Sequence, residues 1–400
     1  MANTNHENLR RLQGEFNASI EDYIKTSSED ANNKGRIAEL QDKITNQATL
    51  IQDEIAPPIS RILQMSWGAS INLAARVAID LDLFNKIPES GVGLDELVKE
   101  TGASSNIILR TLRMLTASHI IAERGQSTYA ATPVSKLLTV PELRDLIKMT
   151  HDNMHPILSA TPAYLRKTGF KDMTSTANGC VDLHGAPFWE AIARDPEQMA
   201  TFQSAMATQE NLPPETVPQY PFAEGFKDIA ADSVHIVDVG GGRGFVLQDL
   251  LKKSPDFPGR LVLQDYPSVI QDAKTANLSE RIELMPHDAT HPQPIKGAKY
   301  YYFRRVFHTW PDHTAIEALK ALHGAFKKGY SKVLIQDEVI KDVGCEPQKA
   351  SQDISMMMLG AMERSEGQWR EVLKEGGFEI TRIVRAEVGV LGVIEAEMVE

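Results

Sequence analysis

The chain has 400 residues, of which 42% are hydrophobic and 24% charged, an ordinary composition for a globular protein of two or three domains. Its net charge of −12 argues against nucleic acid or an anionic membrane as the main partner. Cys180 and Cys345 lie far apart and outside any metal-binding spacing, and no stretch resembles a signal core or membrane span. We therefore expect a cytoplasmic protein without a bound metal.

The first 55 residues are polar, with apolar residues at wide helical spacing and a polar interruption at 27–35. This pattern predicts an N-terminal extension of two helices joined by a linker, over 1–55. The apolar stripes are too thin for a core of their own, so they would pack on another subunit or wrap the rest of the chain. A partly disordered extension is the alternative.

The next predicted domain covers 56–150 and begins with a strongly apolar segment after Pro57-Pro58. From Ile59 to Phe84 the pattern predicts helix with apolar residues on most sides. Such a helix requires burial, and a dimer interface would provide it.

The rest of this domain has the pattern of a winged helix. Short helices are predicted over 94–102 and 104–115, the second opening with serine caps, and a β-hairpin over 120–132. Because winged helices often bind DNA, a regulator is a rival interpretation. The second helix carries only Arg110 and Arg113, too little charge for that role. Packing is expected to occupy its apolar face, formed by Ile107, Ile108, Leu112 and Leu115.

Residues 151–230 are predicted to form a helical connector that lines a substrate pocket, because apolar pockets form where domains meet. Its helices are expected to break at prolines, namely Pro156, Pro162, Pro187, Pro196, Pro213 and Pro214.

From 231 to 400 strands and helices alternate, which predicts a doubly wound, mostly parallel Rossmann-like α/β sheet. The expected strands are 234–239, 260–265, 281–285, 299–303, 332–338, 378–385 and 390–396. The expected helices between them start near Phe245, Pro267, Thr314 and Gly367. The last two strands are joined by a short turn, so they must run antiparallel.

A glycine turn follows the first of these strands, in the order Asp238-x-Gly240-x-Gly242-x-Gly244. The dinucleotide fingerprint Gly-x-Gly-x-x-Gly fits neither register of these glycines. An acid two residues before the first glycine instead suits a cationic, phosphate-free ligand. This pattern predicts S-adenosylmethionine as the cofactor, with a glycine turn of any α/β protein as the plainer alternative.

Ligands of open α/β sheets bind at the carboxyl ends of the strands, and several polar residues fall there. Asp265 ends the second strand and could take both ribose hydroxyls, while Asp288 could take the adenine amino group or cap a turn. His308 follows the fourth strand and is a candidate general base. Either Glu338 or Glu363 could hold its imidazole in the useful tautomer.

Four motifs carry a resemblance to a known family: Val237-Asp-Val-Gly-Gly-Gly-Arg-Gly, Leu263-Gln-Asp-Tyr-Pro, Arg304-Arg-Val-Phe-His-Thr-Trp-Pro-Asp and Met362-Glu-Arg-Ser. The chain closely resembles the caffeate/flavonoid-type class II O-methyltransferases, in particular their fungal secondary-metabolite branch. The resemblance covers about 57–400 and implies a homodimer formed through the winged-helix region.

The resemblance also implies roles for single residues. Gly240, Asp265, Asp288 and Arg304 would contact the cofactor, and Asp238 begins the glycine motif. His308 would be the general base, bracketed by Glu338 and Glu363. Two positions depart from the family pattern: Thr309 replaces the aspartate after the base, and Ala289 replaces a methionine that flanks the adenine.

We therefore expect an O-methyltransferase that uses S-adenosylmethionine to methylate a hydroxyl of a small aromatic or enolic secondary metabolite. The alternative is a pericyclase or dehydratase of the same fold, in which Arg304, His308 or His151 polarises a carbonyl and no methyl is transferred.

Overall fold

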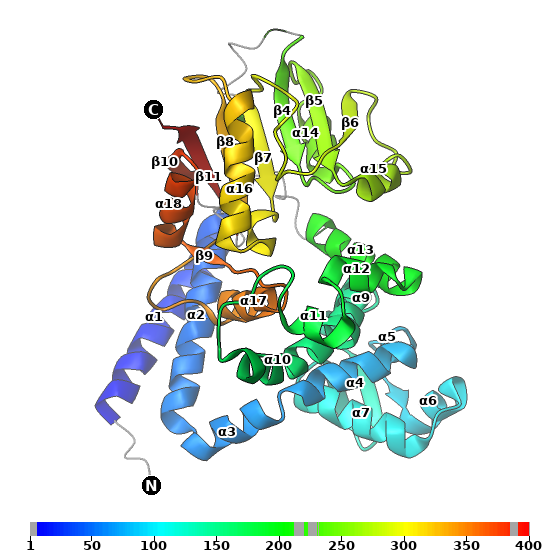
Figure 1. The fold of residues 1–400 in the computed structure, drawn as a ribbon. Helices are drawn as coiled ribbons and strands as arrows, with labels where there is room; N and C mark the ends of the chain where they lie inside the picture. The colour runs from blue at the N-terminus through cyan, green and yellow to red at the C-terminus, as the bar shows by residue number, and fades with distance from the viewer. Residues whose placement is uncertain (1–5, 212–219, 223–229, 231, 385–390, 400) are drawn as a thin grey trace. The chain divides into compact units, whose positions relative to one another are not determined.

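The computed structural model describes all residues except 1–5, 212–219, 223–229, 231, 385–390 and 400. The chain forms two compact units, one of residues 1–151 with 201–206 and one of residues 152–200 with 207–400 (Figure 1). No helix in the described residues is long and apolar enough to cross a membrane.

The first unit is mainly helical and contains a small sheet. Its elements are α1 (His6–Glu29), α2 (Lys34–Ile55), α3 (Pro58–Ser66), α4 (Ala69–Asp80), α5 (Leu83–Lys86), β1 (Val92–Gly93), α6 (Leu94–Thr101), α7 (Ser105–Ala117), β2 (Ile121–Gly125), β3 (Thr128–Ala131), α8 (Pro133–Leu137) and α9 (Pro141–Met149). Helices α1 and α2 pack side by side, so the predicted pair of N-terminal helices is present. Only Leu12 and Leu40 among their hydrophobic side chains are buried.

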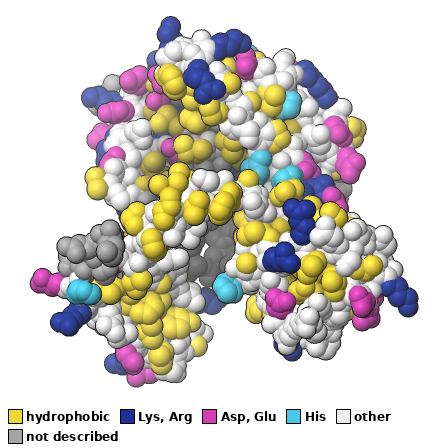
Figure 2. All heavy atoms as spheres, turned by 90° about the horizontal axis from the view of Figure 1, so that it is seen from below, with side chains coloured by type: hydrophobic (Ala, Val, Ile, Leu, Met, Phe, Trp, Pro, Cys, Tyr) yellow, Lys and Arg dark blue, Asp and Glu magenta, His cyan; other side chains and the backbone are white. Residues whose placement is uncertain are grey.

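The apolar segment after the prolines differs from the expectation in one way, since it forms two helices. It is broken at Trp67-Gly68 into α3 and α4, and α3 buries none of its residues within the chain. Met65 is 77% exposed and Trp67 is 65% exposed. Other hydrophobic side chains are also exposed, as the surface view shows for one face (Figure 2). Within the single chain only one face of α4 meets the core, so the burial of this segment at a dimer interface stays a prediction.

The winged-helix arrangement is present, with β1, β3 and β2 forming an antiparallel sheet beside α6 and α7. Two details of the prediction are wrong. Ser104 occupies the N-cap of α7 but its side chain makes no capping hydrogen bond. Ile107 is 46% exposed, because it lies off the face on which Ile108, Leu112 and Leu115 are buried.

The second unit begins with helices and continues into the large sheet. A π-helix over Thr150–Met154 leads into α10 (His155–Thr168), followed by α11 (Gly179–His184), α12 (Phe188–Ala193) and α13 (Pro196–Asn211). Residues 201–206 of α13 belong to the first unit. Pro162 lies inside α10, so the predicted break there is wrong; the helix continues past the one missing N–H. Pro213 and Pro214 lie outside the described residues.

The remaining elements alternate as predicted. They are β4 (Val234–Val239), α14 (Phe245–Lys253), β5 (Arg260–Asp265), α15 (Pro267–Ala273), β6 (Ile282–Pro286), β7 (Tyr300–Arg304), a 3-10 turn (Phe307–Thr309), α16 (Asp312–Leu322), a second 3-10 turn (His323–Ala325), β8 (Lys332–Ile340), α17 (Pro347–Met357), β9 (Arg364–Ser365), α18 (Glu366–Glu375), β10 (Phe378–Val384) and β11 (Leu391–Met398). Helix α17 and the short β9 were not predicted. The turn between β10 and β11 lies outside the described residues.

The sheet has the strand order β10-β11-β8-β7-β4-β5-β6, with β9 paired to β8. Strands β4 to β8 run parallel, whereas β11 runs antiparallel to both β8 and β10. This confirms the doubly wound sheet with an antiparallel last strand. Every residue of β4 is buried, as expected for a strand covered on both faces.

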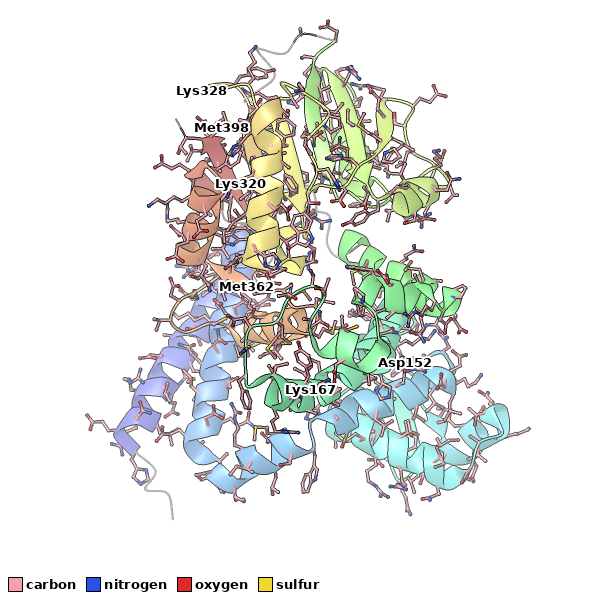
Figure 3. The ribbon with its side chains drawn as sticks, viewed as in Figure 1. Asp152, Lys167, Lys320, Lys328, Met362 and Met398 are labelled. Carbon is pink, nitrogen blue, oxygen red and sulfur yellow. The ribbon has the colours of Figure 1, made fainter. Side chains whose placement is uncertain are left out.

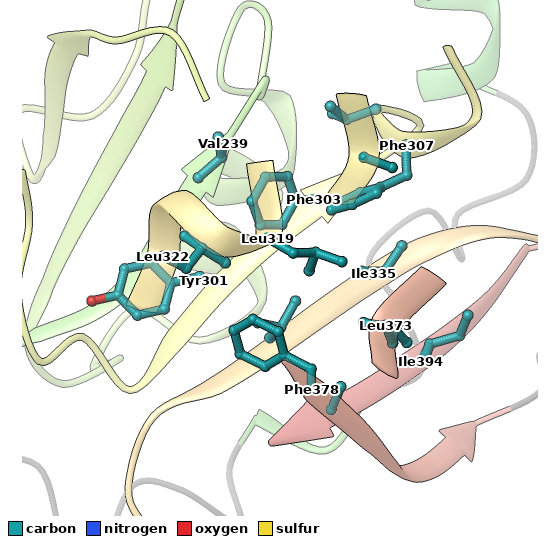
Figure 4. Packing of buried hydrophobic residues seen from close by; sticks show 14 of the residues in the cluster. Val239, Tyr301, Phe303, Phe307, Leu319, Leu322, Ile335, Leu373, Phe378 and Ile394 are labelled. Atoms are coloured by element: carbon teal, nitrogen blue, oxygen red, sulfur yellow. The ribbon is translucent and has the colours of Figure 1, made fainter. Parts of the chain in front are cut away.

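A hydrophobic core fixes the helices against one face of this sheet. Phe303 and Ile335 from β7 and β8 pack with Leu319 of α16 and Leu373 of α18 (Figure 4). Because the interior is close-packed, the carboxyl ends of the strands are held in fixed positions. The residues that follow those ends form the site described next.

Candidate active site

The glycine turn after β4 leaves no space for a side chain at Gly240 or Gly241. Gly240, Gly242 and Gly244 have φ angles of +73°, +59° and +77°, which disfavour other residues. A Cβ on Gly240 would lie 2.6 Å from a methyl group of Val306. The Gly240 N–H donates to the carbonyl of Gln264 at 2.7 Å, which fixes the turn against the end of β5. The turn therefore offers bare backbone at the start of α14.

Asp238 supplies a buried negative charge beside this turn. Its side chain is fully buried, and neither carboxylate oxygen has a hydrogen-bond partner among the described residues. Burial raises the pKa of this carboxyl to about 7, although the positive charge of Arg304 opposes the shift. An unpaired buried carboxylate is costly unless a cation meets it. The position thus suits a ligand with an ammonium group.

Asp265 lies at the end of β5, at the rim of the same turn. Its carboxylate accepts hydrogen bonds from the N–H groups of Gly242 at 2.9 Å and Tyr266 at 2.7 Å. Burial raises the pKa of Asp265, although these two hydrogen bonds oppose the shift. The carboxylate is fixed in place, and its remaining lone pairs can accept from hydroxyl groups.

Asp288 follows β6 and caps its own turn. Its Oδ1 accepts from the N–H of Thr290 at 3.0 Å and from the Thr290 hydroxyl at 2.8 Å. Its Oδ2 lies 3.6 Å from Nδ1 of His291. The turn-capping alternative from the sequence is therefore present, and it leaves Oδ2 half-exposed at this edge of the sheet.

His308 lies in the 3-10 turn after β7 and is held by Glu363. Its Nδ1 lies 2.8 Å from Oε1 of Glu363, and both side chains are buried. Burial lowers the pKa of His308, but the Glu363 hydrogen bond and the charge of Asp337 outweigh it, so the pKa is raised above its ordinary value. With Nδ1 bonded to the carboxylate, the proton sits on Nδ1 and Nε2 is the free basic atom.

The second acid in contact with His308 is Asp337, which the sequence analysis missed. Its Oδ2 accepts from the backbone N–H of His308 at 3.2 Å. Burial raises the pKa of Asp337 to about 6. Glu338, the predicted residue, makes no hydrogen bond to His308. Neither of its oxygens has a hydrogen-bond partner in the part of the chain that the structure describes, and Lys349 Nζ lies 3.9 Å away. Burial raises the pKa of Glu338 to about 7.

The unpredicted helix α17 supplies the residues that hold Glu363. Gln352 donates from Nε2 to Oε1 of Glu363 at 2.8 Å, and Oδ1 of Asp353 accepts from its backbone N–H at 2.9 Å. Met362, the residue before Glu363, is labelled near this helix in Figure 3. The polar run Gln-Lys-Ala-Ser-Gln-Asp at 348–353 could have signalled a helix, but nothing in it marks which residues face Glu363.

The structure thus places two groups of predicted residues at the carboxyl ends of the parallel strands. Asp238, Gly240, Gly242 and Asp265 surround the glycine turn, with Arg304 near enough to act on the charge of Asp238. His308 and Glu363 are bonded to each other. A Rossmann-like sheet with an antiparallel last strand and an acidic glycine turn defines the class of methyltransferases that use S-adenosylmethionine.

Comparison with known proteins agrees with this class. A family model for an O-methyltransferase domain matches residues 173–379, and one for an O-methyltransferase dimerisation domain matches residues 63–141. O-methyltransferase GME11366 of Pestalotiopsis microspora is 32% identical over 339 residues, which is 83% of each chain. Demethylsterigmatocystin 6-O-methyltransferase of Aspergillus flavus is 33% identical, over 80% of this chain and 83% of that protein.

Solved structures share the fold. OxaC matches with a TM-score of 0.84 and 24% identity over 98% of this chain and 99% of its own. LepI in complex with S-adenosylmethionine matches with a TM-score of 0.82 and 24% identity over 97% of this chain and 100% of its own. The chain therefore belongs to the O-methyltransferase family with a dimerisation domain. It is an S-adenosylmethionine-dependent O-methyltransferase of the type found in fungal secondary metabolism.

Proposed function

We propose that the protein methylates a hydroxyl group of a small aromatic or enolic secondary metabolite, with His308 as the general base. The observation that carries this proposal is the buried hydrogen bond between His308 Nδ1 and Glu363 Oε1, which lie 2.8 Å apart. It leaves Nε2 as the atom that accepts the hydroxyl proton. The deprotonated oxygen is the stronger nucleophile, and Glu363 stabilises the imidazolium that forms.

The residues of the glycine turn fit the cofactor. Asp238 has two buried oxygens without a partner, which suit its ammonium group, and Asp265 can accept from its ribose hydroxyls. The bare turn at Gly240 and Gly242 admits it closely, and Arg304 and Asp288 complete the predicted contacts. When bound, S-adenosylmethionine supplies a methyl group on a positively charged sulfur.

Asp337 replaces Glu338 in this proposal as the second acid acting on the base. Its hydrogen bond to the His308 backbone fixes the start of the 3-10 turn, and its charge favours the imidazolium. Glu338 remains a buried acid near Lys349 with an electrostatic effect only.

The test is a pair of histidine variants assayed with methyl-labelled S-adenosylmethionine and an extract from a host strain lacking the gene. His308→Ala is expected to lower the rate of labelled product formation about 10²–10⁴-fold, the usual contribution of general-base catalysis. His313→Ala is the control, because His313 is exposed on α16. Near-normal activity of His308→Ala would exclude this mechanism.

A pericyclase or dehydratase is the second candidate function. A solved structure described as a pericyclic reaction enzyme matches with a TM-score of 0.81 and 25% identity over 96% of this chain. The raised pKa of His308, to which Glu363 contributes, favours an imidazolium, which could polarise a carbonyl instead of accepting a proton. In the labelled assay this function would give an unlabelled, cofactor-dependent product of unchanged mass or minus water.

We also propose a homodimer formed through α3 and α4, in the cytoplasm. The matched dimerisation domain and the exposed hydrophobic side chains of this segment, including Met65 and Trp67, support it. Light scattering of Trp67→Glu should show a monomer where the parent chain shows a dimer; an unchanged mass would place the interface elsewhere.

The 151–230 segment is proposed to line the acceptor pocket, since Gly360, near Glu363, packs on the Thr174 backbone.

A further inference from the structure

Arg305 lies between β7 and the turn that carries His308, in an unusual backbone conformation. Its φ angle is +55°, in the left-handed region that favours glycine. Its N–H donates to the carbonyl of Gln336 at 3.1 Å, which ties this strained position to β8. Strand β7 ends at Arg304, so the alternation of strand side chains does not fix the direction of the Arg305 side chain.

The two arginines act on different groups. The charge of Arg304 acts on Asp238 beside the glycine turn. The charge of Arg305 acts instead on His308 and on the acids around it. Arg305 therefore belongs to the side of the site that contains the base.

Two of the three acids near Arg305 already have a hydrogen-bond partner. Glu363 is hydrogen-bonded to His308 and Gln352, and Asp337 accepts from the His308 backbone, whereas Glu338 lies 3.9 Å from Lys349. Glu363 and Asp337 are therefore held in place without Arg305.

The guanidinium of Arg305 has unused hydrogen-bond donors. Its Nε is buried without a partner, and its side chain makes no ion pair or hydrogen bond with any other residue that the structure describes. A guanidinium has five N–H donors in a rigid fork and prefers anionic or strongly accepting oxygens. Leaving the buried Nε donor unmet is costly, which favours a ligand that meets it.

We propose that Arg305 binds an oxygen of the acceptor that lies beside the hydroxyl to be methylated. The acceptors are then rings in which this hydroxyl neighbours a carbonyl, enolate or carboxylate. This inference rests on the proposed function, because it assumes that the acceptor hydroxyl lies at Nε2 of His308. Arg305 is three residues from His308 in the chain, so one small molecule can contact both side chains.

The chemistry of proton removal favours this pairing. When the hydroxyl proton passes to His308, the negative charge spreads onto a conjugated neighbouring oxygen. Hydrogen bonds from Arg305 to that oxygen strengthen as the charge develops. The hydroxyl oxygen then forms the new bond to the methyl carbon, the carbon–sulfur bond breaks, and its electron pair stays on sulfur.

The test compares two hydroxyanthraquinone isomers, one with its hydroxyl beside a ring carbonyl and one with the hydroxyl a single carbon further away. Binding is measured by tryptophan fluorescence in the presence of adenosylhomocysteine, so that no methyl transfer is needed. The parent protein should bind the first isomer at least about tenfold more tightly, one hydrogen bond to a charged group being worth about that ratio. Arg305→Gln should remove the preference and Arg305→Lys should restore part of it.

Three results would overturn the proposal. In the first, the parent protein shows no preference between the isomers or binds neither. In the second, Arg305→Gln weakens the binding of both isomers equally, which would make Arg305 only a counter-ion of the acids. In the third, the variant loses affinity for adenosylhomocysteine, which would make Arg305 a cofactor-binding residue. Arg370→Gln, an exposed arginine paired with Glu366 on α18, is the matched control. A protein that binds with this preference but transfers no methyl would retain the contact between Arg305 and the ligand oxygen and refute the proposed methyl transfer at the neighbouring hydroxyl.

Discussion

Changing Glu363 to glutamine tests the buried pair at the base without altering its shape. The amide oxygen can still accept from Gln352 and from Nδ1 of His308, so the tautomer is retained and only the charge is lost. A hydrogen bond to a charged group contributes about 1.5–3 kcal/mol. Since the pair is strongest when His308 is protonated in the transition state, kcat should fall by about 10–150-fold, at about 1.4 kcal/mol per decade.

The same substitution has a defined effect on the pH profile. A general base works in its neutral form, so the rate rises as pH increases through the pKa of His308. Burial lowers that pKa and Glu363 raises it, with a net rise. Removing the charge of Glu363 should therefore move the acidic limb of kcat/KM to lower pH.

The assay is initial-rate formation of adenosylhomocysteine across pH with the identified acceptor, with thermal melting to check that the variant folds. The Gln352→Leu variant is a useful companion, because it removes a donor from Glu363 while the charge stays. A Glu363→Gln enzyme with an unchanged limb and unchanged kcat would refute the assignment of Glu363 as the partner of the base.

Two glycine substitutions test the rest of the site. In Gly241→Ala the new Cβ would lie 2.5 Å from Oδ2 of Asp238. Overpacking costs about 1–3 kcal/mol, so S-adenosylmethionine binding measured by calorimetry should weaken about 5–150-fold. An unchanged Kd would show that Asp238 is not a cofactor contact. In Gly360→Ala the Cβ would collide with the backbone of Thr174, so Tm and kcat should both fall; Gly297→Ala, with a similar φ but open space, is the control, and equal losses in the two variants would mean backbone strain alone.

The sheet could be predicted closely because its local signals agree. Strands β4, β7 and β8 are short runs rich in β-branched or aromatic residues, and the parallel strands are separated by turns and helical patterns. Strands β4 and β5 have the predicted bounds, and the others differ by up to two residues at an end. At α3 the sequence shows that an apolar helix needs to be buried, and the dimer interface expected to bury it stays a prediction.

The acids around the base were harder to predict because side-chain direction at a strand end depends on tertiary contacts. Asp337 and Glu338 are neighbours in β8, and composition does not distinguish them. Their contacts in the folded chain distinguish them, because Asp337 reaches the backbone of His308, whereas Glu338 lies towards Lys349. Similarly, the loop carrying Glu363 is positioned by α17, whose polar sequence gave no clear helical period.

The charges of the site explain why one protein can bind a cation and still keep a histidine base. Burial raises the pKa of Asp238 to about 7, that of Asp337 to about 6 and that of Glu338 to about 7, so the isolated site disfavours its own negative charge. A positively charged cofactor reverses this penalty, since it stabilises the anions that it approaches. Glu363 and Asp337 raise the pKa of His308, whereas a cation bound at the strand ends would lower it. The proton affinity of the base would therefore depend on whether the cofactor is bound.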